Sequence, residues 1–573
     1  MTGIRQRQLA QADACLAVLR IELEVALRHL HRLCSEDGRL SAPLLDASQS
    51  VSYALAFAKA EIEASQVMLK YAAGVVADST LVTDMALVFC AGNIRTVWHR
   101  LLAHSTEAGL CQSKLLGLMG SDPLAGFLAE HGEVSRSAAL GAQLVERNSV
   151  HLPSGLDTEK DMIRESFARF TEQVVMPQAE HIHRFDTDIP EDIIKGAAEL
   201  GCFGTSIPER FGGLMPDEPH DSISMLVVTE ELSRGSLGAA GSLITRPEIA
   251  ARALLAGGTE AQKQLWLPRL ASGEKLAAIA LTEPDFGSNV AGLSLKARQI
   301  ENGWVLNGAK TWCTFAGRAD VVVVIARTDP DSGKGHRGLS MFMVEKPPFT
   351  GHEFNYRNSA GGSLSGKAIP TIGYRGMHSY DLSFDNLVVP DTALVGGEAG
   401  LGKGFHLAMA GLSGGRIQTS ARACGVMKAA LERAVSYSID RKVFDASIGS
   451  YQLTQVKLAR MWAALTASRQ FSYAVARMLD SGAGKMEASL VKLFSCHAAE
   501  WVTREAMQIH GGLGYAEETD VSRYFVDARV LSIFEGTEET LALKVIAREL
   551  IASAGRNSMK ENSQIENYLT GNH

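Results

Sequence analysis

The sequence of 573 residues lacks long apolar runs and dense basic clusters. No stretch approaches the roughly 18 to 20 apolar residues of a membrane-spanning helix, and even residues 320–326 have only the length of a strand. The net charge is -8, and no run of Lys and Arg is dense enough to neutralise a phosphate backbone. We therefore expect neither a membrane nor a nucleic acid as a partner.

Cysteine is also sparse and scattered. The eight cysteines show neither the paired spacing of a zinc site nor that of a redox motif, so we expect reduced thiols and no metal centre. Arg5, Arg7 and Arg20 give the N-terminal residues a trace of transit-peptide character, but Asp13 and Glu22 interrupt it. The expected location is therefore the cytoplasm.

The length of the chain and the change in residue pattern along it predict several domains, because 573 residues are too many for one hydrophobic core. Helical periodicity dominates both ends, whereas the middle has short β-branched runs separated by Gly, Asn, Asp and Pro. Turn-forming residues at 148–155 indicate a linker. The predicted units are a helical extension at 1–150, a helical domain at 154–275, a β domain at 276–395, a helical domain at 396–552 and a polar tail at 553–573.

One segment matches the glycine spacing of a dinucleotide fingerprint, GKGHRG at 333–338. That fingerprint requires a helix N-terminus next, to hold a pyrophosphate. Residues 339–344 have the pattern of another strand instead. The glycines therefore predict a hairpin loop, and a Rossmann nucleotide site is not expected.

Two segments in the β region carry a clearer functional signal, LTEPDFGSN at 281–289 and KTWCT at 310–314. Taken alone, the first is an ordinary Pro-Gly turn, and Trp312 is a core aromatic on a strand. Together they resemble the β domain of the acyl-CoA dehydrogenases. Three later segments fit the same resemblance in the same order: RKVF at 441–444, QIHGGLGY at 508–515 and IFEGT at 533–537.

This resemblance covers roughly residues 158–552 and implies an α+β multidomain fold. The fold consists of a helical domain, a β-barrel or sandwich domain and a four-helix-bundle domain, here with an extra N-terminal helical extension. The resemblance also implies FAD as the cofactor. The residues that it assigns to FAD are Leu281, Thr282, Ser288, Trp312, Thr314, Arg441, Phe444, Gln452, Gln508, Gly511, Gly512 and Thr537. By the same resemblance, Arg441 reaches the FAD of a neighbouring subunit.

The resemblance makes Glu535 the catalytic base of an oxidoreductase that desaturates an acyl thioester. Taken alone, a Glu-Gly-Thr triplet could equally be an exposed turn with Glu535 as a solvated side chain. The presence of the other segments in the family's order decides the assignment. Some family members place the base on a neighbouring helix, at a position that aligns with Gly415, where glycine cannot serve. If the loop closes over an acyl chain, burial should raise the pKa of Glu535 and make it a stronger base.

The extension and the segment at 365–376 resemble a family member that acts on a short branched dicarboxylyl-CoA. A second carboxylate needs a cation, and Arg246 is the candidate. A helix-end Arg that neutralises the helix dipole or meets a surface acid explains Arg246 equally well. Arg416 resembles the family's Arg near the CoA moiety, and Ser288 is also expected beside the substrate.

The expected partners are an acyl-CoA, electron-transferring flavoprotein and a second copy of the chain. A homodimer is favoured over a tetramer because the extension would cover a face that other members use to assemble. Three alternatives remain open. They are a dehydrogenase for another short or branched acyl-CoA, an acyl-CoA oxidase, and a flavoprotein of the same fold that performs no dehydrogenation.

Overall fold

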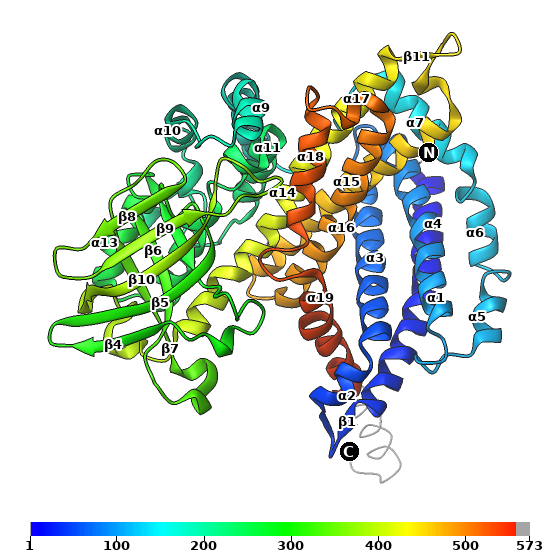
Figure 1. Cartoon of the computed structure of the whole chain (residues 1–573). Coiled ribbons are helices and arrows are strands. Elements are labelled where there is room, and N and C mark those ends of the chain that lie inside the picture. Colours follow the sequence, from blue (N-terminus) through cyan, green and yellow to red (C-terminus); the bar gives the residue numbers. More distant parts are fainter. Residues whose placement is uncertain (1, 557–573) are drawn as a thin grey trace.

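A computed structural model describes residues 2–556 of the chain (Figure 1). The N-terminal part forms a layer of helices with one small hairpin. Its elements are α1 (Thr2–Leu33), β1 (Ser35–Glu36), β2 (Arg39–Leu40), α2 (Ala42–Ala47), α3 (Gln49–Gly74), α4 (Ser79–Ala103), α5 (Gln112–Leu118), α6 (Leu124–His131) and α7 (Val134–Arg147). Helix α3 buries Leu55, Ile62 and Leu69, whose seven-residue spacing places them on one face.

A second group of helices follows a segment without regular structure. Helix α8 (Thr158–Phe170) begins where the carboxylate of Asp157 accepts the Lys160 N–H at 3.0 Å. The π turn η1 (Thr171–Val175) joins it to α9 (Met176–Phe185). The remaining elements of the group are α10 (Glu191–Glu199), η2 (Cys202–Gly204), η3 (Glu209–Phe211), α11 (Ile223–Gly235), η4 (Leu237–Gly241), α12 (Thr245–Gly257) and α13 (Glu260–Ala271).

The middle of the chain forms a curled eight-stranded sheet, at the left of Figure 1. Its strands are β3 (Ala277–Ala280), β4 (Lys296–Ile300), β5 (Gly303–Thr314), β6 (Val321–Arg327), β7 (Leu339–Glu345), β8 (Glu353–Arg357), β9 (Ser363–Ala368) and β10 (Ser379–Pro390). The strand order is β3-β6-β4-β5-β10-β9-β8, and β7 pairs with β6. Short turns η5 (Val290–Gly292) and η6 (Ser332–Gly338) lie between strands, and η7 (Asp391–Ala393) and η8 (Gly397–Gly400) follow β10. Because β6 and β7 are antiparallel neighbours, the predicted hairpin at 333–338 is confirmed.

The last part of the chain is a bundle of long helices. It comprises α14 (Gly404–Asp440), α15 (Gln452–Asp480), α16 (Lys485–His510), α17 (Gly512–Tyr515), α18 (Asp520–Leu531), α19 (Glu538–Thr540) and the π-helical η10 (Leu541–Ala547). A hairpin of β11 (Lys442–Val443) and β12 (Ala446–Ser447), with the turn η9 (Ile448–Ser450), links α14 to α15. Residues 548–556 are helical, so the first residues of the predicted polar tail continue a helix. Residues 557–573 of that tail lie outside the described residues.

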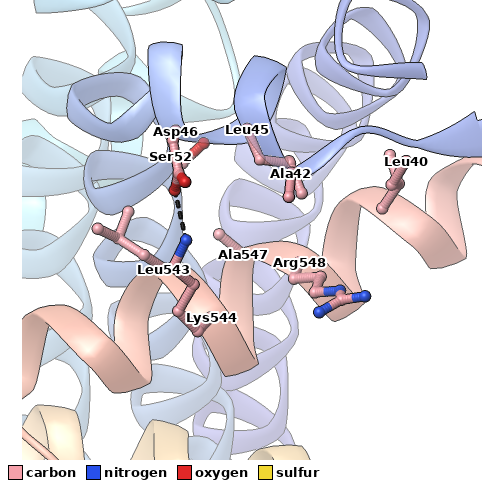
Figure 2. A pocket seen from close by; sticks show the side chains of 9 residues that line it. All are labelled: Leu40, Ala42, Leu45, Asp46, Ser52, Leu543, Lys544, Ala547 and Arg548. Carbon is pink, nitrogen blue, oxygen red and sulfur yellow. Dashed lines mark hydrogen bonds and ion pairs between the residues drawn. The ribbon is translucent and has the colours of Figure 1, made fainter. Parts of the chain in front are cut away.

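The N-terminal helices pack on the bundle, with α7 and α3 against α15 and α3 also against α16 and η10 (Figure 1). A small cavity of about 50 Å³ lies where α2 meets η10, and Lys544 forms an ion pair with Asp46 across that contact (Figure 2). The segment at 148–155 is fixed to α15, because Trp462 donates to the Val150 carbonyl at 2.8 Å and Gln470 to the Ser154 carbonyl at 2.9 Å. The extension is therefore part of the packed molecule.

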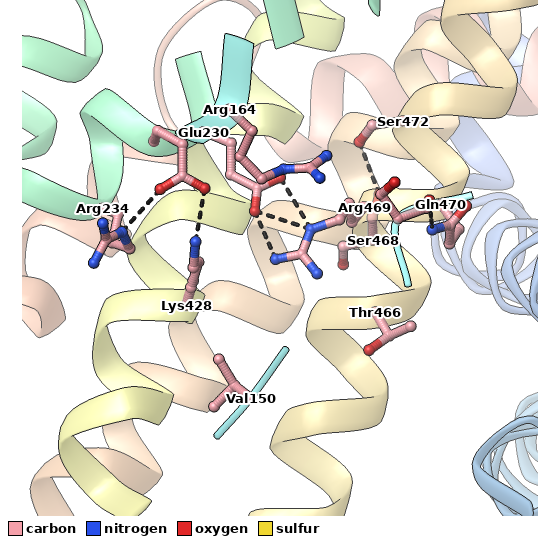
Figure 3. A network of polar contacts seen from close by, with 12 residues as sticks. Val150, Arg164, Glu230, Arg234, Lys428, Thr466, Ser468, Arg469, Gln470 and Ser472 are labelled. Carbon is pink, nitrogen blue, oxygen red and sulfur yellow. Dashed lines mark hydrogen bonds and ion pairs between the residues drawn. The ribbon is translucent and has the colours of Figure 1, made fainter. Parts of the chain in front are cut away.

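Buried ion pairs join α11 to the bundle (Figure 3). Arg469 on α15 makes a two-nitrogen contact with Glu230, with the shortest distance 2.6 Å. Glu231 receives Lys428 at 2.6 Å and Arg234 at 2.9 Å. Buried carboxylates of this kind are tolerated only when they are paired, so these contacts fix how the two helical units meet. Within residues 2–556, no helix is long and apolar enough to cross a membrane.

Candidate active site

Glu535 lies in the loop between α18 and α19, at the junction of the bundle with α12 and the sheet. Its backbone is left-handed, with φ 56°, and the next residue, Gly536, has φ 98°. A left-handed non-glycine residue is strained, and such residues gather at functional sites. The side chain of Glu535 is only 8% exposed. The Lys492 ammonium donates to the Gly536 carbonyl at 2.7 Å and holds the loop in place.

Helix α14 supplies the hydrogen bonds to the Glu535 carboxylate. Arg422 Nη2 donates to Oε1 and Thr419 Oγ1 donates to Oε2, both at 2.7 Å. Gly415, Thr419 and Arg422 share one helix face because they are four and then three residues apart. A Cβ atom on Gly415 would lie 2.9 Å from Glu535 Oε2. The face of α14 at Gly415 therefore borders the same space as Glu535.

The pKa of Glu535 lies below its usual value in this structure. Burial alone would raise it, but the charges of Arg422 and Arg246 and the hydrogen bonds from Arg422 and Thr419 outweigh burial. The rise expected from burial under a closed loop therefore does not describe this arrangement, in which nearby cations dominate. Glu535 is ionised at neutral pH and is held by α14.

Further cations surround this carboxylate. Arg246 on α12 is buried, donates to the Tyr374 hydroxyl at 3.2 Å and adds its charge to that of Arg422 in lowering the pKa of Glu535. Burial lowers the pKa of both Arg416 and Lys492, and the charge of Glu535 opposes this. Within the described residues, neither Arg246 nor Arg416 has a carboxylate within 4.0 Å. The site therefore has an excess of positive charge.

Trp312 projects from a bulge in β5. Opposite Asp381 of β10, strand β5 has two residues, Thr311 and Trp312, where regular pairing has one. Trp312 takes φ 57°, and the residue is 56% exposed. It borders a hollow of about 1030 Å³ lined by β5, β8, β9 and β10. An exposed indole beside a hollow of this size can stack on a planar ring system, as a flavin requires.

The other predicted residues of the β domain surround Trp312 and the loop of Glu535. Thr540 links Ser288 to the loop of Glu535, because its hydroxyl donates to Ser288 Oγ at 3.1 Å and accepts from the Thr537 hydroxyl at 3.0 Å. The Thr282 carbonyl accepts the N–H of Thr311, beside Trp312, at 2.9 Å. The Lys310 ammonium donates to the Leu281 carbonyl at 2.8 Å. The hydroxyls of Thr314 and Ser379 lie 2.9 Å apart.

The remaining predicted residues lie elsewhere. Arg441, Phe444, Gln452, Gln508, Gly511 and Gly512 are exposed around β11 and α17, at the end of the bundle away from the sheet (Figure 1). Gly511 has φ 58°, and an added Cβ there would meet nothing within 4 Å in the described chain. One copy of the chain thus does not bring this group to Trp312.

Four polar residues that contact Glu535, its loop or Arg246 were not predicted from the sequence: Thr419, Arg422, Lys492 and Tyr374. The spacing of Thr419 and Arg422 from Gly415 was a usable signal, because it places all three on one face of a helix. Tyr374 carried no such signal. It lies in an irregular segment before β10. Its ring centroid is 5.6 Å from that of Phe534, and the two ring planes are nearly perpendicular, at 81°.

Comparison with known proteins places these features in a family. Residues 157–274, 278–387 and 402–551 match the N-terminal, middle and C-terminal domains of acyl-CoA dehydrogenases. The chain belongs to the acyl-CoA dehydrogenase family, which confirms the fold class and the family inferred from the sequence. It is therefore a flavin-dependent oxidoreductase with FAD as its cofactor, and the exposed indole of Trp312 fits that cofactor.

Individual relatives narrow the comparison. The chain is 36% identical over 558 residues to (2S)-methylsuccinyl-CoA dehydrogenase of Cereibacter sphaeroides, which covers 95% of this chain and 98% of the relative. An acyl-CoA dehydrogenase of Bacillus subtilis is also 36% identical but covers only 69% of this chain. Butyryl-CoA dehydrogenase from Megasphaera elsdenii superposes with a TM-score of 0.63 at 32% identity, covering 69% of this chain and 99% of its own. A chain from a structure of the electron transferring flavoprotein of Acidaminococcus fermentans superposes with a TM-score of 0.61 at 30% identity. The superposition covers 70% of this chain and 97% of that chain.

Proposed function

We propose that the protein oxidises (2S)-methylsuccinyl-CoA to mesaconyl-CoA in the ethylmalonyl-CoA pathway. One observation carries this proposal: the buried Arg246 and the partly buried Arg416 lie near Glu535, and neither has a carboxylate within 4.0 Å among the described residues. A neutral acyl chain gives these cations no partner, whereas a dicarboxylyl chain supplies a second anion. The similarity over 95% of the chain to a methylsuccinyl-CoA dehydrogenase supports the same substrate.

Glu535 acts as the base of this reaction. Its carboxylate takes the proton from the α carbon of the thioester, and the β hydrogen leaves with its electron pair on the opposite face. Bound FAD supplies the hydride acceptor. Because the Glu535 side chain is buried, water does not compete with its carboxylate for the α proton of the substrate. Lys492 holds the backbone of the loop at Gly536. Trp312, Ser288 and Thr537 would hold FAD at this junction.

The second carboxylate of the substrate binds Arg246 and the Tyr374 hydroxyl. Arg246 is buried with no carboxylate partner among the described residues, which makes the helix-dipole or surface-acid explanation of this Arg less apt. Arg422 is near the same space, because its charge and that of Arg246 both act on Glu535. A substrate carboxylate competes with Glu535 for these cations. Its binding therefore weakens the hold of Arg422 on Glu535 and frees the base to reach the α proton.

A second copy of the chain completes the FAD site. Arg441, Gln452 and Gln508 are exposed but lie away from Trp312 in the same chain, so they reach FAD bound to a partner. Helices α3 and α7 cover faces of α15 and α16, which favours a homodimer over a larger assembly. Light scattering of the purified protein should give a dimer, and a tetramer would contradict this arrangement.

Electron-transferring flavoprotein accepts the electrons from the reduced enzyme. The likeness to a chain in the flavoprotein structure of Acidaminococcus fermentans supports a role in flavin electron transfer. The cytoplasmic location stays a prediction from the sequence.

The proposal is tested by mixing the FAD-containing protein anaerobically with a panel of acyl-CoAs and following loss of flavin absorbance. The panel contains methylsuccinyl-CoA, glutaryl-CoA, butyryl-CoA and isovaleryl-CoA. Methylsuccinyl-CoA should reduce the flavin fastest. Faster reduction by a neutral acyl-CoA would refute the dicarboxylyl substrate while leaving dehydrogenation itself intact.

A further inference from the structure

Two histidines and an aspartate converge where α9 meets the sheet, outside the site of Glu535. Asp186 follows the last residue of α9, His352 directly precedes β8, and His378 directly precedes β10. The two Nε2 atoms lie 3.2 Å apart. Asp186 Oδ2 lies 3.5 Å from His352 Nε2, and Asp186 Oδ1 lies 3.3 Å from His378 Nε2. Three side chains from three separate segments therefore bring ligand atoms within 4.8 Å of one another.

These separations match the edges of a tetrahedral metal site. Zinc binds imidazole nitrogen and carboxylate oxygen at about 2.0 to 2.2 Å, so two ligands at a tetrahedral angle are separated by about 3.3 Å. The carbonyl oxygen of Asp186 lies 3.0 Å from His352 Nε2 and 3.2 Å from His378 Nε2. That carbonyl or a water can take the fourth position.

The contacts of His378 leave the lone pair of its Nε2 facing Asp186 and His352. Asp188 Oδ1 lies 3.2 Å from His378 Nδ1, and the Gly351 N–H donates to Asp188 Oδ2 at 2.6 Å. A carboxylate at Nδ1 keeps the proton on that nitrogen and leaves the Nε2 of the neutral ring as an acceptor. Metal-binding histidines in proteins are commonly oriented by such a carboxylate.

We propose that Asp186, His352 and His378 bind one divalent ion of the zinc class. Two nitrogen ligands with one carboxylate suit Zn²⁺ or Co²⁺ better than Mg²⁺ or Ca²⁺, which prefer oxygen ligands alone. The sequence predicted no metal centre because the three residues are far apart along the chain, without recognisable ligand spacing. Only the fold brings them together.

One side-chain cation lies close to the cluster. Arg375 Nε lies 3.8 Å from Asp186 Oδ1, but Arg375 also donates to the His183 carbonyl at 2.9 Å and to the Thr371 carbonyl at 3.0 Å. Arg375 is therefore engaged by two backbone carbonyls beside the cluster.

Bound zinc would tie the end of α9 to two strands of the sheet. His378 is followed by Ser379, whose hydroxyl lies 2.9 Å from that of Thr314. Thr314 is one of the residues assigned to FAD. The metal would thus stabilise the junction of the helical domain with the flavin-binding strands, and this role is independent of which acyl-CoA the enzyme uses.

The test uses the full-length, FAD-containing protein, stripped with a chelator and dialysed against Zn²⁺. Elemental analysis should find one zinc per chain, and zinc should raise the midpoint of thermal unfolding. The protein carries Cys111→Ser throughout, because Cys111 is an exposed thiol that can bind zinc by itself.

The decisive variant is His352→Ala, because this side chain is 51% exposed and its loss leaves the core intact. It should hold no zinc and show no zinc-dependent rise in the midpoint. His336→Ala is the matched control, since His336 pairs with His406 at 5.7 Å outside the cluster, and it should bind zinc as the parent does. Equal zinc content in the parent and in His352→Ala, or none in either, would overturn the proposal.

Discussion

Arg422 donates a hydrogen bond of 2.7 Å to Glu535, and the guanidinium that makes it is fully buried. This contact sets the ionisation of the proposed base. Burial raises the pKa of Glu535, and the opposing charges of Arg422 and Arg246 bring it below its ordinary value. A carboxyl with a lowered pKa stays ionised above that pKa and loses its charge only as the pH falls through it. The free enzyme should therefore hold a competent base well into mild acid.

Arg422→Met should move the acid limb of the kcat/KM profile to higher pH. Without the guanidinium, burial raises the pKa of Glu535 with less opposition, so the base becomes protonated at a less acidic pH. The profile is measured with butyryl-CoA, a neutral substrate, so that lost binding of a substrate carboxylate does not contribute. Thr419→Val removes one hydrogen bond but no charge, and it should give a smaller shift in the same direction. An acid limb that stays in place for Arg422→Met would contradict the assignment.

Glu535→Gln should retain FAD and bind acyl-CoA but reduce the flavin at least about 10³-fold more slowly, because an amide cannot accept the α proton. The matched control is Glu248→Gln. Glu248 is also buried, and the charge of Glu535 contributes to the rise in its pKa, although burial contributes more. If Glu535 is the base, Glu248→Gln keeps flavin reduction within about tenfold of the parent. Loss of reduction in Glu248→Gln with retention in Glu535→Gln would reassign the base.

The sequence was sufficient for the family and the fold class, because those rest on short segments in a fixed order. The assignment of Glu535 as the base stays a prediction. The sequence was not sufficient for the surroundings of Glu535. Tyr374 reaches the site from an irregular segment, and its place depends on how three domains pack together. The exposure of Trp312 depends on a bulge that arises only when β5 pairs with β10, and no local pattern encodes that pairing.

Arg246→Met should raise the KM for methylsuccinyl-CoA by about 10- to 100-fold, the loss expected for a hydrogen bond between charged groups. The KM for butyryl-CoA should change far less, because that chain has no second carboxylate. Arg169→Met removes the same charge from an exposed position on α8, and it should leave both KM values unchanged. A proportional change for both substrates in Arg246→Met would show that Arg246 serves the structure rather than the substrate.

Tyr53→Phe tests whether the N-terminal extension supports catalysis. The Tyr53 hydroxyl on α3 donates to Glu538, three residues after Glu535, and His497 lies 3.7 Å from the same carboxylate. Loss of one of these contacts should loosen the loop, so kcat for flavin reduction should fall a few-fold, with little change in KM. Tyr71→Phe is the matched control, because Tyr71 lies on the same helix but donates to the Pro153 carbonyl at 2.5 Å. Both variants should lower the unfolding midpoint by similar amounts, since each loses one hydroxyl contact of the extension. Only Tyr53→Phe should slow the reaction, and an equal kcat in the two variants would confine the extension to a packing role.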